Sequence, residues 1–191
     1  MPPTPRGPDR RTEILETAAR LFAEQGFHAT SMRDLCAALG MSPGNLYHWF
    51  PSKQAIIAAF VEADRADTAA RLAALSSAAD LRAALPGQLL TTVTEASEAE
   101  IRLYLEVYAT ALRDPELAPL VREADEAARA QLAALLAGIG VAAPDSAALA
   151  IIALLDGLMS RRAMDPGRDL AELAAPIGAA LHAILGTETH R

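Results

Sequence analysis

The stretch from Thr30 to Lys53 constrains this chain more than any other, because it predicts two short helices on either side of a tight turn. Ser31 and Asp34 form the S-x-x-D pattern of a capping box, which predicts the start of a helix over about 31–39. Gly40 suits the left-handed residue that commonly ends such a helix. The sequence therefore predicts both the start and the end of the first short helix.

A second short helix is predicted directly after this turn. Ser42 is a suitable N-cap, and Pro43 fits the first helical position, where its missing N–H group is not needed. Pro51 prevents the helix from continuing beyond about residue 49. Two short helices joined by a tight turn are typical of the helix-turn-helix motif, whose second helix enters the major groove of DNA.

Composition predicts that the rest of the chain is helical as well. Alanine and leucine dominate, aromatic residues make up only 4 %, and no convincing run of alternating β-branched residues is present. Hydrophobic content of 52 % and charged content of 21 % are typical of a globular protein, and 191 residues suffice for a sizeable core. We predict an all-α fold of about nine helices.

Proline, glycine and serine clusters divide the chain into a tail, a head and a body. Residues 1–8 are expected to be a disordered tail, residues 9–68 a head whose helix-turn-helix spans 31–50, and residues 69–191 a larger helical body. The predicted helices span about 9–25, 31–39, 42–49, 52–75, 81–98, 101–112, 115–137, 146–164 and 169–185.

Three prolines affect the predicted helices of the body. Pro115 is expected at the first position of the seventh helix. Pro86 is expected to delay or kink the fifth helix, and Pro176 to kink the last helix or split it into two pieces.

The predicted helix over 146–164 is apolar almost all round and must therefore be covered on every side. We expect this helix and the helix over 169–185 to pair with their two-fold mates in a homodimer, as a four-helix bundle. The alternative is that both helices are buried within one protomer.

The charge of the chain is unevenly distributed. Its net charge is −7, but residues 1–54 carry +1 and the remainder −8. Contact with DNA phosphate requires a local basic surface and not a basic protein, so the predicted head is compatible with a DNA partner.

The sequence offers no pattern for catalysis, a metal or a cofactor. Cys36, the only cysteine, lies on the apolar face of its helix and is expected to be a buried hydrophobe. The four histidines have no metal-ligand spacing, and there is no phosphate-binding glycine loop and no nucleophile pair. We therefore expect no enzyme activity and no cofactor.

We expect a cytoplasmic protein with no membrane partner. The N-terminal residues lack the apolar region of a secretory signal. The longest uncharged apolar run, 147–155, is far shorter than the ~20 residues of a membrane span.

Residues 10–55 resemble the head of the TetR family of bacterial transcriptional regulators. The resemblance is carried, at the family's spacing, by Gly26-Phe27, Thr30-Ser31, Asp34-Leu35, Leu39-Gly40, Ser42-Pro43, Leu46-Tyr47, Phe50 and Ser52-Lys53. Residues 154–158 are similar to the eighth helix of a subset that includes choline-responsive repressors. The resemblance implies a DNA-binding head and a body that dimerises and binds a small effector. The function it implies is a repressor released from a palindromic operator.

The predicted DNA-contacting residues centre on the first turn of the second motif helix. Gly44 lets the backbone approach DNA closely, and Asn45 can bond adenine in a bidentate way. The long guanidinium of Arg33 suits guanine or phosphate. The full predicted set is Thr30, Ser31, Arg33, Ser42, Pro43, Gly44, Asn45, Tyr47, His48 and Lys53.

The resemblance implies a phosphate contact for Tyr47 and for Lys53, the only lysine in the chain. A packed core tyrosine and a solvated lysine are the alternatives. Leu46 and Phe50 are expected to face the core of the head, and Trp49 is also expected in the core.

The effector pocket is less constrained. Tyr104 and Tyr108, four residues apart on one predicted helix, are placed to present hydroxyls beside Arg102, with Leu155 and Met159 as an apolar wall. Ordinary core packing of these residues is the alternative. The aliphatic composition favours an apolar or amphipathic effector.

Two other functions remain open at this point. One is a DNA-binding dimer that responds to no effector, and the other is an all-α adaptor whose head binds protein. Gly44, Asn45 and Lys53 favour DNA over protein because they suit base edges and phosphate.

Overall fold

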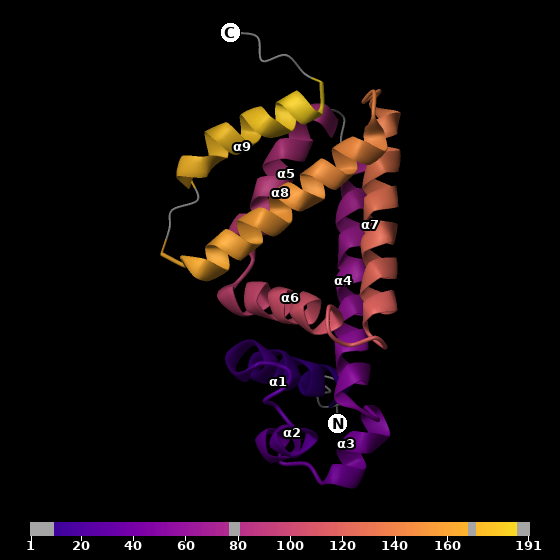
Figure 1. The fold of residues 1–191 in the computed structure, drawn as a ribbon, viewed down its shortest axis with the longest axis vertical. Helices are drawn as coiled ribbons and strands as arrows, with labels where there is room; N and C mark the ends of the chain where they lie inside the picture. The colour runs from indigo at the N-terminus through magenta and orange to yellow at the C-terminus, as the bar shows by residue number, and fades with distance from the viewer. Residues whose placement is uncertain (1–9, 77–80, 168–170, 187–191) are drawn as a thin grey trace, which may run out of the picture. The chain divides into compact units, whose positions relative to one another are not determined.

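The computed structural model describes residues 10–76, 81–167 and 171–186, and within these ranges the chain is helical and contains no strand (Figure 1). The all-α prediction is therefore confirmed. The predicted disordered tail, 1–8, lies outside the described residues. The helices are α1 (Arg10–Gln25), α2 (Met32–Leu39), α3 (Pro43–Trp49), α4 (Lys53–Ser76), α5 (Leu81–Glu95), α6 (Glu98–Ala111), α7 (Ala118–Gly138), α8 (Pro144–Met164) and α9 (Ala171–Ile184).

The chain divides into two compact units. The first comprises Met1–Glu62 and Arg102–Val121, and the second comprises Ala63–Ile101 and Arg122–Arg191. Helices α4, α6 and α7 each contribute residues to both units. The boundary near residue 68 between a DNA-binding head and a body stays a prediction.

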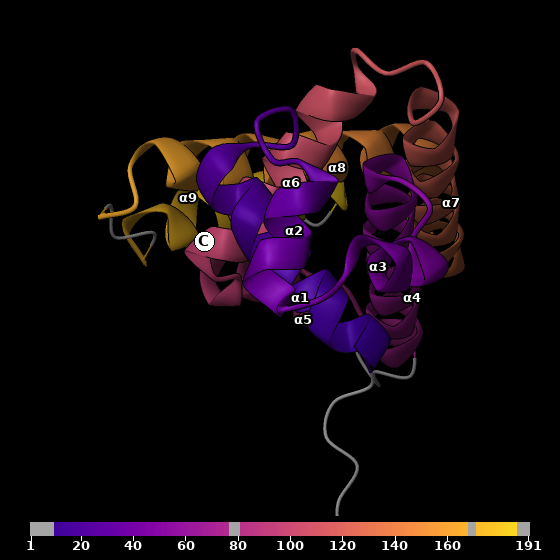
Figure 2. The ribbon, with the colours of Figure 1, turned by 90° about the horizontal axis from the view of Figure 1, so that it is seen from below.

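Short capped helices build the first unit, where α1 contacts α2 and α2 contacts α3 (Figure 2). Ser31 caps α2 with an extended backbone, and Gly40 ends it with a φ of 61°. Ser42 caps α3, as its position before Pro43 predicts. Helices α1 to α4 contribute buried side chains to the core of this unit, among them Ile14, Ala18, Leu21, Phe22, Leu35, Cys36, Leu39, Leu46, Ile56 and Ile57.

Apolar packing builds the second unit, in which α5, α8 and α9 contact one another (Figure 1). Its core draws on four helices and contains Leu85, Leu89, Val93, Leu132, Ala133, Leu136, Ala147, Ala148, Ile151, Leu158, Ile177, Leu181 and Leu185. Among the residues described, no helix combines the length and the apolar character that crossing a membrane requires.

Helices α6 and α7 each start three residues from the predicted position, and α8 begins at Pro144, two residues before its predicted start. Helix α7 begins at Ala118 and not at Pro115, because the carboxylate of Asp114 accepts the N–H groups of Glu116 and Leu117 and forms a turn first. Helix α6 begins earlier than predicted, at Glu98, because a capping box precedes it.

The prolines inside α5 and α9 do not interrupt either helix. Pro86 lies within α5 and Pro176 within α9, and each helix is continuous between its ends. The predicted delay of α5 and the predicted split of the last helix are therefore wrong, and a kink at either proline stays a prediction. Each proline is the sixth residue of its helix, so its ring replaces an N–H group that would otherwise donate to the carbonyl four residues earlier.

Candidate nucleic-acid interface

Helix α3 exposes almost all of its side chains. Among its residues only Leu46 is buried, and Phe50, which follows the helix, is also buried. Both were expected to face the core of the head. The exposed residues are Pro43, Gly44, Asn45, Tyr47, His48 and Trp49. A helix attached through a single buried residue is free to present its other sides to a partner.

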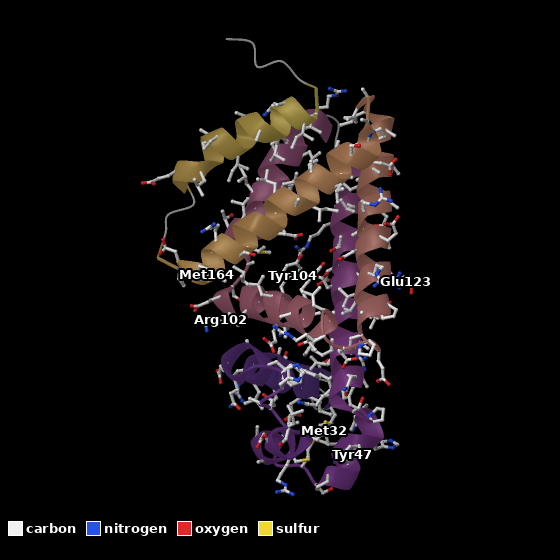
Figure 3. The ribbon with its side chains drawn as sticks, viewed as in Figure 1. Met32, Tyr47, Arg102, Tyr104, Glu123 and Met164 are labelled. Atoms are coloured by element: carbon white, nitrogen blue, oxygen red, sulfur yellow. The ribbon has the colours of Figure 1, made fainter. Side chains whose placement is uncertain are left out.

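The aromatic residues of α3 contribute to this exposed surface. Tyr47 is 50 % exposed and projects from α3 (Figure 3), which argues against the alternative of a core tyrosine. Trp49 is 37 % exposed, so the expectation that it is a core residue is wrong. Its ring lies edge-on to that of His48, with 6.2 Å between the centroids. Trp49 lies four residues after Asn45 in the sequence. This i, i+4 spacing places both side chains on one face of the helix, and it could have indicated that Trp49 is exposed.

The start of α3 leaves room for close approach. A side chain at Gly44 would meet no other atom within 4 Å. The Ser42 hydroxyl accepts a hydrogen bond from the Asn45 N–H at 3.4 Å, which leaves the Ser42 hydroxyl proton available to a ligand. Arg33 is exposed on the neighbouring helix α2.

A second arginine lies beside the end of α3. The guanidinium carbon of Arg11, in the first turn of α1, lies 5.4 Å from the centre of the Phe50 ring. This cation–π contact brings a positive charge close to α3. Arg11 is not among the predicted DNA-contacting residues, because its contact with Phe50 joins residues distant in the chain.

Ser31 is engaged in its capping box. Its hydroxyl donates to Asp34 Oδ2 at 2.6 Å, and its N–H donates to the same oxygen at 2.8 Å. These hydrogen bonds lower the pKa of the Asp34 carboxyl. The hydroxyl has only one proton, so the prediction that Ser31 donates it to phosphate is not supported.

Thr30 is fully buried. Its hydroxyl donates to the carbonyl of Gly26 at 2.9 Å, which fixes the turn between α1 and α2. The prediction that this hydroxyl reaches DNA is therefore wrong, because the side chain has no access to a ligand.

Lys53 is also held by the protein. Its ammonium donates to the carbonyls of Phe27 and Thr30, at 2.5 Å each, and Nζ lies 4.3 Å from the centre of the Phe27 ring. Burial lowers the pKa of this ammonium, and the Asp34 carboxylate opposes that shift. Two of its three N–H groups are thus engaged, and its contact with phosphate stays a prediction.

The five predicted pocket residues fall in different units. Arg102, Tyr104 and Tyr108 lie on α6 in the first unit, as Figure 3 shows for Arg102 and Tyr104. The two tyrosine rings have centroids 4.6 Å apart. Leu155 and Met159 lie on α8 in the second unit and pack, partly buried, against its core. The three α6 residues and the two α8 residues therefore form two separate groups, one in each unit.

The second unit has a hollow of about 450 Å³ that none of these five residues lines. Arg82 lies on its wall and donates to the carbonyls of Ile139 and Leu185, the residues that directly follow α7 and α9. Over the described ranges, no group of three or more histidine, cysteine or acidic side chains is placed to bind a metal ion.

Two family models match most of the chain. Residues 14–60 match the model of the bacterial regulatory proteins of the tetR family, and residues 77–186 match that of the BetI-type transcriptional repressor C-terminal region. The first match contains α2 and α3, and the second contains α5 to α9.

Two transcriptional regulators, UidR and KstR2, are similar to this chain in sequence. The chain is 31 % identical to the HTH-type transcriptional regulator UidR of Escherichia coli K12 over 120 residues, which cover 59 % of this chain and 57 % of UidR. It is 41 % identical to the HTH-type transcriptional repressor KstR2 of Rhodococcus jostii over 91 residues, which cover 47 % of this chain and 44 % of KstR2. The chain thus spans about half the length of these relatives.

Solved structures match over more of the chain. Salmonella enterica GusR superimposes with a TM-score of 0.80 and 30 % identity, covering 92 % of this chain and 95 % of GusR. The ketosteroid transcriptional regulator KstR2 of Mycobacterium tuberculosis gives a TM-score of 0.65 and 26 % identity, covering 95 % of each chain.

Proposed function

Because this chain belongs to the TetR family of bacterial regulatory proteins, we propose that it is a cytoplasmic, sequence-specific DNA-binding transcriptional regulator. It acts as a repressor and is released from a palindromic operator when a small apolar or amphipathic effector binds. The observation that carries the proposal is the exposure of α3, which buries only Leu46 and directs its other side chains outward.

In the proposed complex, α3 lies in the major groove and its first turn contacts base edges. Gly44 admits the DNA backbone or a base edge, and Asn45 supplies an amide for adenine. Ser42, Pro43, Tyr47, His48 and Trp49 border this contact and reach sugar or phosphate. Arg33 on α2 provides the charge for a phosphate or guanine contact.

We infer that the regulator is a homodimer paired through α8 and α9. Leu149 is 59 % exposed and Met164 is 82 % exposed, both on α8, so both side chains are accessible to a second copy. On α9 the exposed residues after Glu172 are small and uncharged: Ala174, Ala175, Pro176, Ala179, Ala180 and Ala183. Such helices pack closely against a second copy, and a two-fold dimer presents two reading helices to a palindrome.

The proposed effector contacts both polar and apolar side chains. Arg102, Tyr104, Tyr108, Leu155 and Met159 stay the proposed effector-contacting residues on chemical grounds, since an amphipathic effector needs both polar and apolar side chains. An effector acts by preferring the conformation that does not bind DNA, and a preference of about 1–3 kcal/mol suffices for a measurable response.

Binding-site selection from a random duplex library tests the proposal. The wild-type chain should enrich a short palindrome, and Asn45→Ala should relax the preference at the base that Asn45 contacts. Failure of the wild-type chain to enrich any sequence would contradict the proposal.

Gly44→Asp makes the test sharper, because the new side chain has room and suits the start of a helix. It should fold as the wild type does and lose at least about tenfold in DNA affinity through repulsion by phosphate. Gly87→Asp is the matched control, because it adds the same charge at an exposed glycine of α5 with equal room.

The two alternative functions give different results. A dimer that responds to no effector would select a palindrome but release it with no compound in a metabolite library. A protein-binding adaptor would select no DNA, and its Gly44→Asp variant would lose a protein partner instead.

A further inference from the structure

We propose that Glu106 and Lys53 form a clamp on the turn of residues 26–30 and thereby position α2 and α3 for DNA. The inference rests on the proposed function and adds two positioning residues to it. It also gives Lys53 a role other than contact with phosphate. We call this arrangement the turn clamp, meaning Glu106, Lys53 and the turn 26–30.

Glu106, on α6, holds the N–H group of Phe27. Its Oε1 atom accepts this hydrogen bond at 2.6 Å, across 79 residues of sequence. Gly26, with a φ of 87°, brings the backbone close to the carboxylate, since a Cβ there would lie 3.5 Å from Oε1. Hydrogen bonds to a charged acceptor are about twice as strong as neutral ones.

Lys53, in the first turn of α4, holds the carbonyl of the same residue. Its ammonium donates to Phe27 and also to the carbonyl of Thr30, at the other end of the turn. The first turn of a helix is an unfavourable place for a cation, because the free N–H groups there already carry partial positive charge. Two carbonyl acceptors and the face of the Phe27 ring compensate for that position.

The turn itself is fixed between these two side chains. The carbonyl of Gly26 accepts both the N–H and the hydroxyl of Thr30, at 3.2 and 2.9 Å. Residues 26–30 therefore move as one piece, and Glu106 and Lys53 determine where that piece lies. Both contacts belong to the first compact unit.

The position of the turn affects DNA binding because the turn leads directly into α2. Ser31, the next residue, is the N-cap of α2, and α2 contacts α3. A shift of the turn therefore displaces α2 and α3 relative to the start of α4. A misplacement of about 1 Å in a binding site is enough to lower function strongly.

The test measures DNA affinity as a function of salt concentration for Glu106→Ala and Lys53→Met, on the duplex that the wild-type chain selects. Loss of a hydrogen bond to a charged group should weaken binding by about tenfold or more in each variant. The slope of log affinity against log salt should stay unchanged, because no phosphate contact is lost. The double variant should lose less than the sum of the two single losses, since both act on one turn.

Three variants serve as controls. Glu106→Gln keeps an oxygen that accepts from Phe27 and should restore most of the affinity. Glu116→Ala removes the same charge from an exposed position of the first unit and should bind as the wild type does. Arg33→Ala should reduce the salt slope by about one, as a direct phosphate contact would.

Hydrogen exchange at the Phe27 amide gives a readout that needs no DNA. This amide should be protected in the wild type and in Glu106→Gln, and should exchange faster in folded Glu106→Ala. Unchanged exchange, or wild-type affinity in Glu106→Ala, would overturn the clamp.

A reduction of the salt slope by about one in Lys53→Met would assign Lys53 to phosphate and overturn its positioning role. A wild-type chain that selects no duplex would overturn the proposed function and this inference with it. Normal selection with an indifferent Glu106→Ala would overturn only the inference.

Discussion

The two compact units hold their helices in different ways. In the first unit, α2 and α3 are short and begin at serines whose side chains accept backbone N–H groups. In the second unit, the long helix α8 begins at Ala143, which has no side-chain cap, and its position follows from apolar packing. The comparison indicates that short helices depend on polar groups at their ends, whereas long helices depend on the residues along their length.

The largest expected effect comes from the one anchor of α3. Leu46→Ala should lower the free energy of unfolding by about 2–5 kcal/mol, because the side chain is fully buried. Urea unfolding measures the loss. Leu112→Ala is the control, since Leu112 is 87 % exposed, and its change should stay within about 0.5 kcal/mol. Equal effects in the two variants would contradict a single-residue anchor.

The second unit should respond to a charge on its exposed small-residue face. Ala179→Glu should weaken the proposed dimer by about 3 kcal/mol, because an unpaired carboxylate would be buried between two copies. Analytical ultracentrifugation would detect monomers. Ala134→Glu, at an exposed position of α7, should leave the association state unchanged. Dimers that persist in Ala179→Glu would rule out this face of α9.

The helix caps allow a direct comparison between the units. Ser31→Ala and Ser97→Ala should each cost about 1 kcal/mol, because each serine caps a helix by accepting a backbone N–H group. Ala143→Ser should add a smaller amount of stability by supplying the cap that α8 lacks. Thermal unfolding measures all three. A stability loss in Ala143→Ser would show that its backbone does not permit capping.

Acid should weaken both units slightly through the same two capping boxes. Hydrogen bonds from Ser31 and Ser97 lower the pKa of Asp34 and Glu100 from their ordinary values of 3.8 and 4.5. The unfolded chain therefore binds more protons near these values, so this stability is present at neutral pH and lost as the pH falls through them. Urea midpoints from about pH 6 to pH 3 follow the loss, and the decline should be shallower in Ser31→Ala with Ser97→Ala.

The sequence predicts a helix end well when the residues that determine it lie close together in the chain. The ends of α2 and α3 were predicted closely, because Ser31, Gly40 and Ser42 act within a few residues. The start of α6 was missed although Ser97 and Glu100 carry the same S-x-x-[DE] signal. The start of α6 was therefore predictable from its sequence.

The interface was predicted less completely, and for a different reason. The exposed residues of α3 follow from one helical period once Leu46 is taken as buried. Neither the partners of Lys53 nor the contact of Glu106 with Phe27 follows from any local pattern, since 26 and 79 residues separate these pairs. Such contacts depend on the tertiary fold.

The single anchor of α3 has a consequence for how such a protein changes over time. Pro43, Gly44, Asn45 and His48 contribute little to stability, since their side chains are exposed. Substitutions at those exposed positions should alter stability by no more than about 0.5 kcal/mol. Evolution, or an engineer with a mutant library, can therefore change the surface of the proposed reading helix while the fold that carries it stays intact.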